Sequence, residues 1–307
     1  MKYAVLFALV CMMMVEAYAQ EGRVSHDRVV AKIKDLLDEN YILQRNIKRI
    51  SDSLAACSYS DMSHQEFADR INSVLIKSSK DKHLHLEYNP SYAQKMLGHS
   101  DANEGQRKEE KITNFGFEKL EILPGNIGLL KIAYFADPTD LDELITSAYT
   151  FFKNTDNLII DLRGNSGGSG AMLQKLVSGF LPVDASIILR IEYRNDTIHL
   201  KVDSTPLFRY ENPLYLLCDG KTFSAGEGFA LVLQNRRRAT VIGETTAGAG
   251  NIAGPYVVDK DFVLTIPVGV VLDPLTGSGW ESGGVIPDIP ASAGSALEKA
   301  IEKIRHK

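Results

Sequence analysis

Residues 141–243 alternate between short apolar runs and segments with the periodicity of amphipathic helices, and this alternation limits the fold more than any other feature. The apolar runs are residues 158–162, 214–218 and 240–243, and the helical segments are residues 141–152, 171–180 and 225–234. Short apolar runs between helices are typical of buried strands in a layered α/β core. We therefore predict an α/β fold rather than an all-β sandwich.

The segments that flank this region predict further elements. Apolar residues recur at helical spacing over residues 26–58, and Ser63 with Glu66 forms a capping box that starts a second helix. The remaining elements are hairpins over residues 117–135 and 256–266, a closing helix over residues 297–304 and a polar loop or linker over residues 89–111. We expect a small N-terminal helical subdomain over residues 20–80 and an α/β domain over residues 81–307.

The first 19 residues have the pattern of a cleavable signal peptide. Lys2 precedes an apolar stretch over residues 3–15, and Ala17-Tyr18-Ala19 offers small residues at the cleavage positions. We therefore expect a mature chain that starts near Gln20 and is secreted or periplasmic. No later stretch is apolar over the length needed to span a membrane, so stable membrane insertion is not expected.

Net charge and cysteine usage exclude some classes of function. The net charge of −5 and the pI of about 5.8 argue against a phosphate-binding surface, and no basic run carries interleaved aromatic residues. Nucleic acid is therefore not an expected partner, and Arg236-Arg237-Arg238 is interpreted as a solvated helix end. Cys57 and Cys218 could form a disulfide after export, but Cys218 closes an apolar run, which favours two separate buried thiols.

Two turns rich in small residues follow two of the apolar runs. They are residues 161–168 and 221–227, and the second contains Ser224 just before a helix. A serine at a helix N-terminus lies near backbone N–H groups that have no partner inside the helix and could bind an oxyanion. This pattern indicates acyl-transfer chemistry with Ser224 as the nucleophile. The alternative is that Ser224 or Thr222 only caps the helix.

A serine nucleophile needs a base, and histidine is the better candidate because the first lysine after Ser224 is Lys260, on a predicted hairpin. His83 and His85 alternate with leucines as in a half-exposed strand, so we expect both to share one face. The alternative is a polar strand face in solvent. The other histidines lie in terminal, loop, helical or polar segments: His26, His64, His99, His199 and His306. No metal site is expected, because the pair of His83 and His85 has no evident third ligand.

An acidic residue that could orient the histidine lies near the C-terminus. Glu281 follows the only tryptophan in a glycine-flanked segment, residues 279–285, where its alternative role is a loop salt bridge or a cap. Glu227 and Glu244 are rival candidates. The glycines of residues 164–170 could also bind phosphate, but they lack the GxGxxG spacing and no Walker lysine follows, so no nucleotide cofactor is expected.

At these residues the sequence resembles the tail-specific, or C-terminal-processing, serine peptidase family, which includes the tricorn core protease and the interphotoreceptor retinoid-binding protein modules. The resemblance runs from about residue 80 to residue 297, and five motifs occur in the order of the family. They are Asp81-x-His83, Asp161-x-Arg163-x-Asn165-x-Gly167-Gly168, Ser224-Ala225-x-Glu227, Gly243-Glu244-x-Thr246-x-Gly248 and Gly284-Val285-x-Pro287-Asp288. The resemblance implies a crotonase-like or Clp-protease-like α/β core.

The resemblance also implies a mechanism. Many bacterial members use a lysine within Gly-Lys-Gly, but this chain has Gly248-Ala249-Gly250 there, so the serine and lysine dyad is absent. The tricorn-like branch uses histidine and glutamate, which correspond to His83 and Glu281 beside Ser224. The chain departs from the family at two points: Lys82 stands where the tricorn-like enzyme has a serine, and no PDZ domain fits between His83 and the first predicted hairpin.

These implications combine into an exported serine endopeptidase that acts on polypeptides without a metal or an organic cofactor. Ser224 is expected to attack the scissile carbonyl, His83 to accept its proton and Glu281 to hold the imidazole. The expected oxyanion-hole donors are the backbone N–H groups of Gly167 or Gly168 and of Ala225. The rival hypothesis is a non-catalytic ligand- or peptide-binding module of the same fold.

Overall fold

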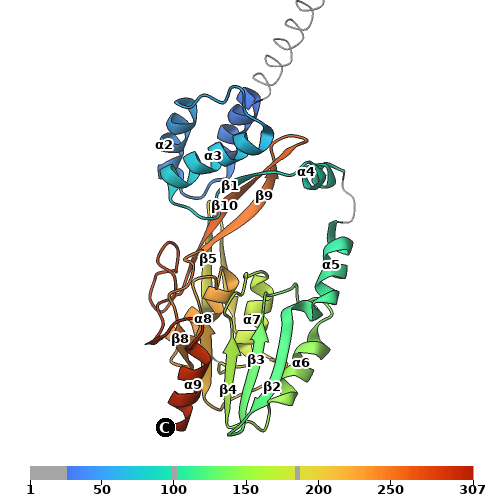
Figure 1. Cartoon of the computed structure of the whole chain (residues 1–307), viewed down its shortest axis with the longest axis vertical. Helices are drawn as coiled ribbons and strands as arrows, with labels where there is room; N and C mark the ends of the chain where they lie inside the picture. The colour runs from blue at the N-terminus through green and yellow to red at the C-terminus, as the bar shows by residue number, and fades with distance from the viewer. Residues whose placement is uncertain (1–25, 99–101, 184–186, 307) are drawn as a thin grey trace, which may run out of the picture. The chain divides into compact units, whose positions relative to one another are not determined.

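A computed structural model describes residues 26–98, 102–183 and 187–306 (Figure 1). The predicted signal peptide, residues 1–19, lies outside the described residues. Within the described ranges, no helix is both long enough and apolar enough to cross a membrane.

The described residues form two compact units. The first contains the described residues up to Ala102 together with Ala253–Val268, and the second contains the described residues of Asn103–Ile252 and Gly269–Lys307. This division differs from the predicted boundary after residue 80, because the strand that follows His83 pairs with a strand of Ala253–Val268. The first unit therefore extends beyond the predicted helical subdomain and includes His83.

Helices supply most of the first unit: residues 26–40, α2 (Gln44–Ala55) and α3 (His64–Ser79). The predicted capping box at the start of α3 is confirmed. The Ser63 amide donates to the Glu66 carboxylate over 2.8 Å, and the Glu66 amide donates to Ser63 Oγ over 3.3 Å. The buried faces of these helices share one hydrophobic core.

Two antiparallel strands complete this core, β1 (His85–Tyr88) and the first part of β10 (Phe262–Leu272). Leu86 and Leu264 are paired across the two strands, and both are buried. β9 (Asn251–Val257) also pairs with β10, so the second predicted hairpin is confirmed. The core of the first unit therefore depends on two segments that are distant in the sequence.

The polar segment after β1 contains two helices, α4 (Pro90–Leu97) and α5 (Ala102–Ile112), so the predicted loop or linker over residues 89–111 is wrong. The Asn89 side chain accepts a hydrogen bond from the Tyr92 amide over 3.1 Å, and Pro90 occupies the first helical position. These local start signals outweigh the few apolar residues that a periodicity argument requires.

The second unit contains a six-stranded sheet with the order β11-β8-β7-β4-β3-β2. These strands are β2 (Phe117–Leu123), β3 (Ile127–Ile132), β4 (Asn157–Asp161), β7 (Leu214–Cys218), β8 (Ala239–Gly243) and β11 (Ile289–Pro290). Neighbouring strands are parallel except β2 and β3, which form the first predicted hairpin. The predicted alternation of buried strands with helices is confirmed.

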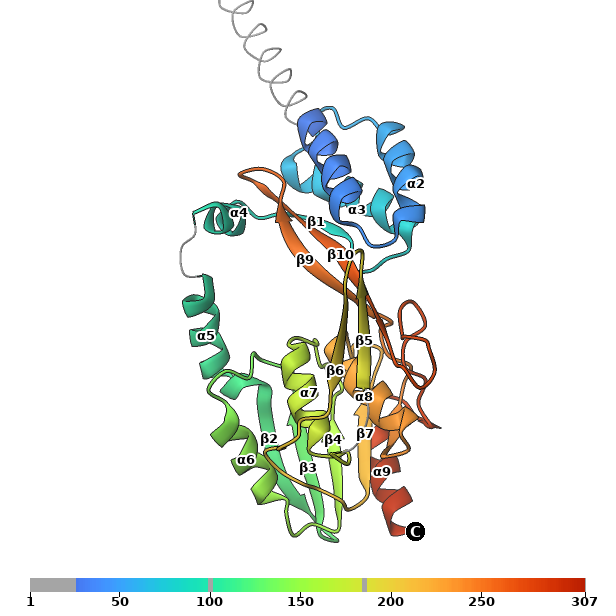
Figure 2. The same ribbon diagram turned by 180° about the vertical axis from the view of Figure 1, so that it is seen from behind.

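Helices cover both faces of this sheet (Figure 2). Leu158 and Ile160 of β4 share a core with α6 (Asp142–Phe151), α7 (Gly170–Ser178) and α8 (Ala225–Asn235). Ile159 of the same strand belongs to a different core, with α9 (Ala296–Arg305). Alternate side chains of one strand thus face opposite layers, which explains why the whole run is apolar.

The second unit also holds an antiparallel sheet, in which β5 (Ile187–Tyr193) pairs with β6 (Thr197–Lys201) and with the last part of β10. The arginines after α8 contact this region, so the prediction of a solvated helix end is wrong. Arg236 donates to the Ile187 carbonyl over 3.0 Å, and Arg238 donates to the Phe180 carbonyl over 3.0 Å. Arg236 also pairs with the buried carboxylate of Asp273 over 3.1 Å, whereas Arg237 is exposed.

Cys57 and Cys218 form no disulfide in the described part of the chain. Cys57 is half-buried in the first unit, and Cys218 is buried at the end of β7. Burial raises the pKa of the Cys218 thiol, so this side chain is held in its neutral, unreactive form.

Candidate functional site

The two turns rich in small residues meet at the carboxyl ends of the parallel strands β4 and β7. The fully buried Asn165 side chain donates to a carbonyl of β3 over 2.9 Å, and its backbone carbonyl accepts a hydrogen bond from the Phe223 amide over 2.9 Å. Gly226 packs against the same side chain, since a Cβ atom there would lie 2.5 Å from Asn165 Oδ1. The first turn therefore supports the second, which carries Ser224.

Asp219, the first polar residue after β7, also joins the two turns. Its Oδ1 atom accepts hydrogen bonds from the amides of Gly164 and Thr222 over 3.0 and 2.9 Å. The Thr222 hydroxyl donates to the Leu162 carbonyl over 2.8 Å, so it supports the opposite turn rather than capping α8. Asp219 was not among the predicted site residues, although a polar residue directly after a buried strand is a detectable signal.

Ser224 has an unusual backbone conformation for a residue that precedes a helix. Its φ of 49° and ψ of −117° favour glycine, whereas Ser63 precedes α3 with the extended φ of −64° and ψ of 162° that helix caps usually adopt. The turn also needs Gly167, because a Cβ atom there would lie 2.8 Å from Ser224 Cβ. Strained residues concentrate at functional sites. The conformation favours a functional role for Ser224 over the role of a simple cap.

The strain at Ser224 leads to a stability prediction. Glycine adopts a positive φ without the clash of a Cβ atom, whereas alanine keeps that atom. We expect the free energy of unfolding of Ser224→Gly to be about 1 kcal/mol higher than that of Ser224→Ala. Differential scanning calorimetry of the two variants measures this difference. A Ser224→Gly protein that is no more stable than Ser224→Ala would show that the turn stores no strain.

The predicted oxyanion-hole amides differ in their hydrogen bonds. The Gly167 amide donates to Asn165 Oδ1 over 2.8 Å, so it is already in use. The amides of Gly168 and Ala225 donate none of the hydrogen bonds found within the described ranges. Gly168 has a φ of 123°, and a Cβ atom there would lie 2.2 Å from the Phe135 carbonyl oxygen. Gly168 and Ala225 are therefore the stronger candidates for binding an oxyanion.

The side chain of Glu227 is fully buried and accepts four hydrogen bonds from the protein. Its Oε2 atom accepts from the amides of Ser224 and Ala249 over 2.8 and 2.9 Å. Its Oε1 atom accepts from the Gly248 amide over 2.7 Å and from the Thr246 hydroxyl over 2.5 Å. Both oxygens are engaged in holding backbone, so Glu227 is a poor candidate for orienting a histidine.

Glu281 contacts the loop of residues 246–251, which also supplies hydrogen-bond donors to Glu227. Its Oε2 atom accepts hydrogen bonds from the amides of Gly250 and Asn251 over 2.7 and 3.1 Å. The indole N–H of the buried Trp280 donates to the Ala249 carbonyl over 2.9 Å. Within the second unit, Glu281 is therefore linked to the Ser224 turn through this loop and Glu227.

Glu244, the third acidic candidate, serves a different part of the second unit. It is exposed and accepts hydrogen bonds from the amides of Gly220 and Ala293 over 3.3 and 2.9 Å. Neither donor belongs to the loop that contacts Glu281. Glu244 therefore fits the role of a surface tie between loops.

His83 belongs to the first unit, whereas Ser224 and Glu281 belong to the second. It is buried in the turn before β1, where its amide donates to Asp81 Oδ1 over 3.0 Å. Burial lowers the pKa of His83, against the opposing effect of the Asp81 carboxylate. His85 is exposed, so the expectation that both histidines share one half-exposed strand face is wrong. The strand begins only at His85, because the Asp81 turn occupies the preceding residues.

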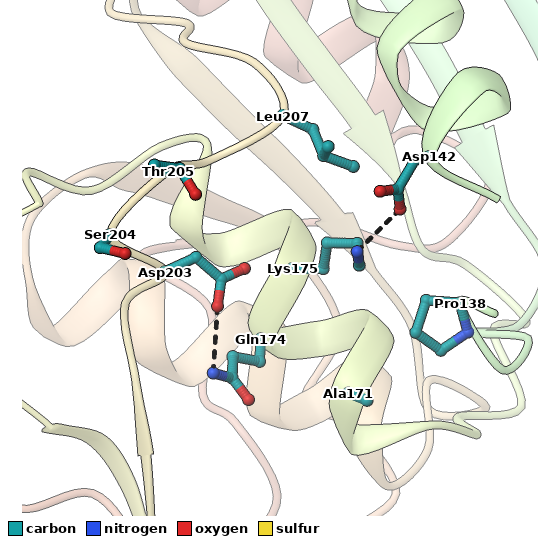
Figure 3. Close-up of a pocket in the computed structure, with 9 residues that line it drawn as sticks. All are labelled: Pro138, Asp142, Ala171, Gln174, Lys175, Asp203, Ser204, Thr205 and Leu207. Atoms are coloured by element: carbon teal, nitrogen blue, oxygen red, sulfur yellow. Dashed lines mark hydrogen bonds and ion pairs between the residues drawn. The ribbon is translucent and has the colours of Figure 1, made fainter. Parts of the chain in front are cut away.

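A polar pocket of about 470 Å³ lies beside α7 in the second unit (Figure 3). It is lined by Pro138, Asp142, Ala171, Gln174, Lys175, Asp203, Ser204, Thr205 and Leu207. Lys175 pairs with Asp142 over 2.8 Å, and Gln174 donates to Asp203 over 3.2 Å. Ala171 lies in the first turn of α7, but the residues that line the pocket include none from the turns of residues 161–168 and 221–227.

Residues 126–291, more than half of the 307 residues, match the sequence profile described as Peptidase family S41. The matched segment includes Ser224, Glu281 and the glycine-rich turn, and it begins after His83.

Two curated bacterial proteins are similar in sequence. The tail-specific protease of Haemophilus influenzae is 28% identical over 180 residues, which are 58% of this chain and 25% of that protein. The carboxy-terminal-processing protease of Bartonella bacilliformis is 29% identical over 170 residues, which are 54% of this chain and 38% of that protein. The matched part of this chain thus spans well under half the length of either relative.

A solved structure is similar in fold. The photosystem II D1 C-terminal processing protease superposes with a TM-score of 0.58 at 14% sequence identity, covering 88% of this chain and 94% of that chain. This similarity agrees with the layered α/β architecture.

Proposed function

This chain belongs to peptidase family S41, and we propose that it is a serine-type peptidase that hydrolyses peptide bonds in polypeptides with Ser224 as the nucleophile. The conformation of Ser224 carries the proposal. A serine with a φ of 49° stands at the start of α8, next to Gly167 and close in sequence to the Ala225 amide. The proposal is supported by this geometry, because a strand-to-helix turn of this kind can present a nucleophile beside donors for an oxyanion.

In the proposed reaction His83 Nε2 or Nδ1 takes the proton of the Ser224 hydroxyl while Ser224 Oγ bonds to the scissile carbonyl carbon. The negative charge that forms on the carbonyl oxygen is stabilised by the amides of Gly168 and Ala225, at about 3 kcal/mol for each donor. The imidazolium then protonates the leaving amine, and water hydrolyses the resulting ester by the same proton route. Glu281 holds the imidazole during these transfers.

The environment of His83 supports its role as the base. Its pKa is lowered by burial, so the imidazole is neutral at pH 7 and has a lone pair available for the Ser224 proton.

We also propose that the peptidase acts outside the cytoplasm, in the periplasm or the surrounding medium. The support is the signal-like pattern of residues 1–19. Its substrates are then polypeptides that are exposed after export.

Labelling with a serine-directed fluorophosphonate tests the nucleophile directly. The mature protein is treated under native conditions, digested, and the modified peptide is identified by mass spectrometry, with Ser224→Ala and His83→Ala as controls. We expect modification at Ser224 that is lost in both variants. If the native protein is not labelled, Ser224 is not an activated nucleophile, and a non-catalytic ligand- or peptide-binding module becomes the better description.

A further inference from the structure

Glu227 holds the backbone on which the proposed nucleophile stands. It is buried at 0% exposure, and one of its four hydrogen bonds comes from the Ser224 amide over 2.8 Å. Burying a carboxylate in a protein core is costly unless its oxygens are satisfied, and here each oxygen accepts two hydrogen bonds. This side chain therefore fixes its donors relative to one another.

The other donors belong to the loop that contacts Glu281. Consecutive amides of this loop are divided between the two carboxylates: Gly248 and Ala249 donate to Glu227, and Gly250 and Asn251 donate to Glu281. A shift of the loop would thus move the donors of both carboxylates. The Ser224 amide is thus connected to the loop through Glu227, and the loop is connected to the Glu281 carboxylate through the Gly250 amide.

We infer that Glu227 is a positioning residue, which sets Ser224 and Glu281 in one frame through the loop of residues 246–251. The inference rests on the proposed function, since it assigns Glu227 a role in that same site. Both carboxylate oxygens of Glu227 already accept hydrogen bonds from the protein, so the inferred role is not a chemical one. Its contribution is geometric, and a displacement of about 1 Å in a catalytic group lowers turnover by about 100-fold.

Glu227→Gln tests this role with almost no change in volume. A glutamine side chain has one acceptor oxygen and one NH₂ group. The NH₂ group therefore faces at least one backbone amide, which can donate a hydrogen bond but cannot accept one. In either orientation a loop amide, that of Gly248 or of Ala249, loses its acceptor. We expect the rate of fluorophosphonate labelling at Ser224 to fall by about 10- to 100-fold. With a peptide substrate, kcat is expected to fall by the same factor while KM stays within about twofold.

Trp280 supplies a readout that does not depend on catalysis. It is the only tryptophan of the chain, and its indole N–H donates to the Ala249 carbonyl. We expect Glu227→Gln to shift the Trp280 emission to longer wavelength and to raise its quenching by acrylamide. Glu244→Gln is the matched control, because Glu244 also accepts two backbone amides in the second unit but none from this loop. It should leave both the labelling rate and the emission unchanged.

A milder pair of variants covers the case in which Glu227→Gln does not fold. Thr246→Val removes one of the four donors, and Thr246→Ser keeps the hydroxyl that donates to Glu227 and accepts from the Val285 amide. We expect Thr246→Val, but not Thr246→Ser, to change labelling and emission in the direction of Glu227→Gln.

Two outcomes separate this inference from the proposed function. If the native protein is not labelled at all, the proposed function fails, and the emission of Trp280 alone decides whether Glu227 holds the loop. If the native protein is labelled but a folded Glu227→Gln protein reacts at the native rate with unchanged emission, Glu227 positions neither group and the inference is overturned.

Discussion

Replacement of Ser224 by alanine is expected to lower peptide hydrolysis by a factor on the order of 10⁶ while the protein stays folded. The reason is that no other group takes over the covalent step once the hydroxyl is gone, and water alone must attack the carbonyl. The Cβ atom is kept, so the turn between β7 and α8 loses no packing. Steady-state hydrolysis of a quenched fluorescent peptide measures the loss, and circular dichroism verifies the fold.

Ser169 provides the matched control for that experiment. It caps α7, and its hydroxyl accepts a hydrogen bond from the Met172 amide over 3.3 Å. Ser169→Ala should cost about 1 kcal/mol of stability, as the loss of a helix cap does, and leave the chemical step in place. Hydrolysis that survives in Ser224→Ala at more than a few per cent of the native rate would assign the nucleophile to another residue.

Replacement of His83 by alanine is expected to lower hydrolysis by about 10⁴-fold or more, because Ser224 then lacks a base. The native enzyme should also lose activity as the pH falls, since a protonated imidazole cannot accept a proton. Burial lowers the pKa of His83 from 6.5, so the acid limb of kcat/KM is expected below pH 6.5. A pH–rate profile measures this limb.

His85→Ala is the control for this prediction, because His85 is exposed two residues away and should not change the profile. An acid limb at or above pH 6.5, or full activity in His83→Ala, would contradict the assignment. The same lowered pKa has a stability consequence. Below pH 6.5 His83 is protonated in the unfolded chain but still neutral in the folded chain. The free energy of unfolding therefore falls as the pH drops from 6.5 towards the lowered pKa.

The layered core could be predicted because it depends on local patterns. The apolar residues 158–162 identify a strand buried on both faces, and Ser63 with Glu66 identifies a helix start from its own hydrogen bonds. Ser224 was also detectable, since small residues after a buried strand are a local signal. Its positive φ was not, because Ser224 packs against Gly167 of another turn, a contact that the local sequence does not reveal.

Features that depend on distant residues could not be predicted. His83 looked like part of a half-exposed strand, but the Asp81 turn and burial in the first unit give it a different environment from His85. Glu227 looked like an alternative acid, yet its four donors come from segments up to 22 residues away. α4 begins with local start signals, Asn89 and Pro90, but the few apolar residues of the segment that contains α4 and α5 hid both helices.

The two-segment construction of the first unit has a consequence for biosynthesis. Its helices leave the ribosome early, whereas Phe262, Leu264 and Ile266, which complete their core, are translated near the end of the chain. Domains generally fold in the order in which they are made, but this unit must wait for its last strand. The core of the first unit therefore stays incomplete through most of translation and can close only after Phe262, Leu264 and Ile266 have been made.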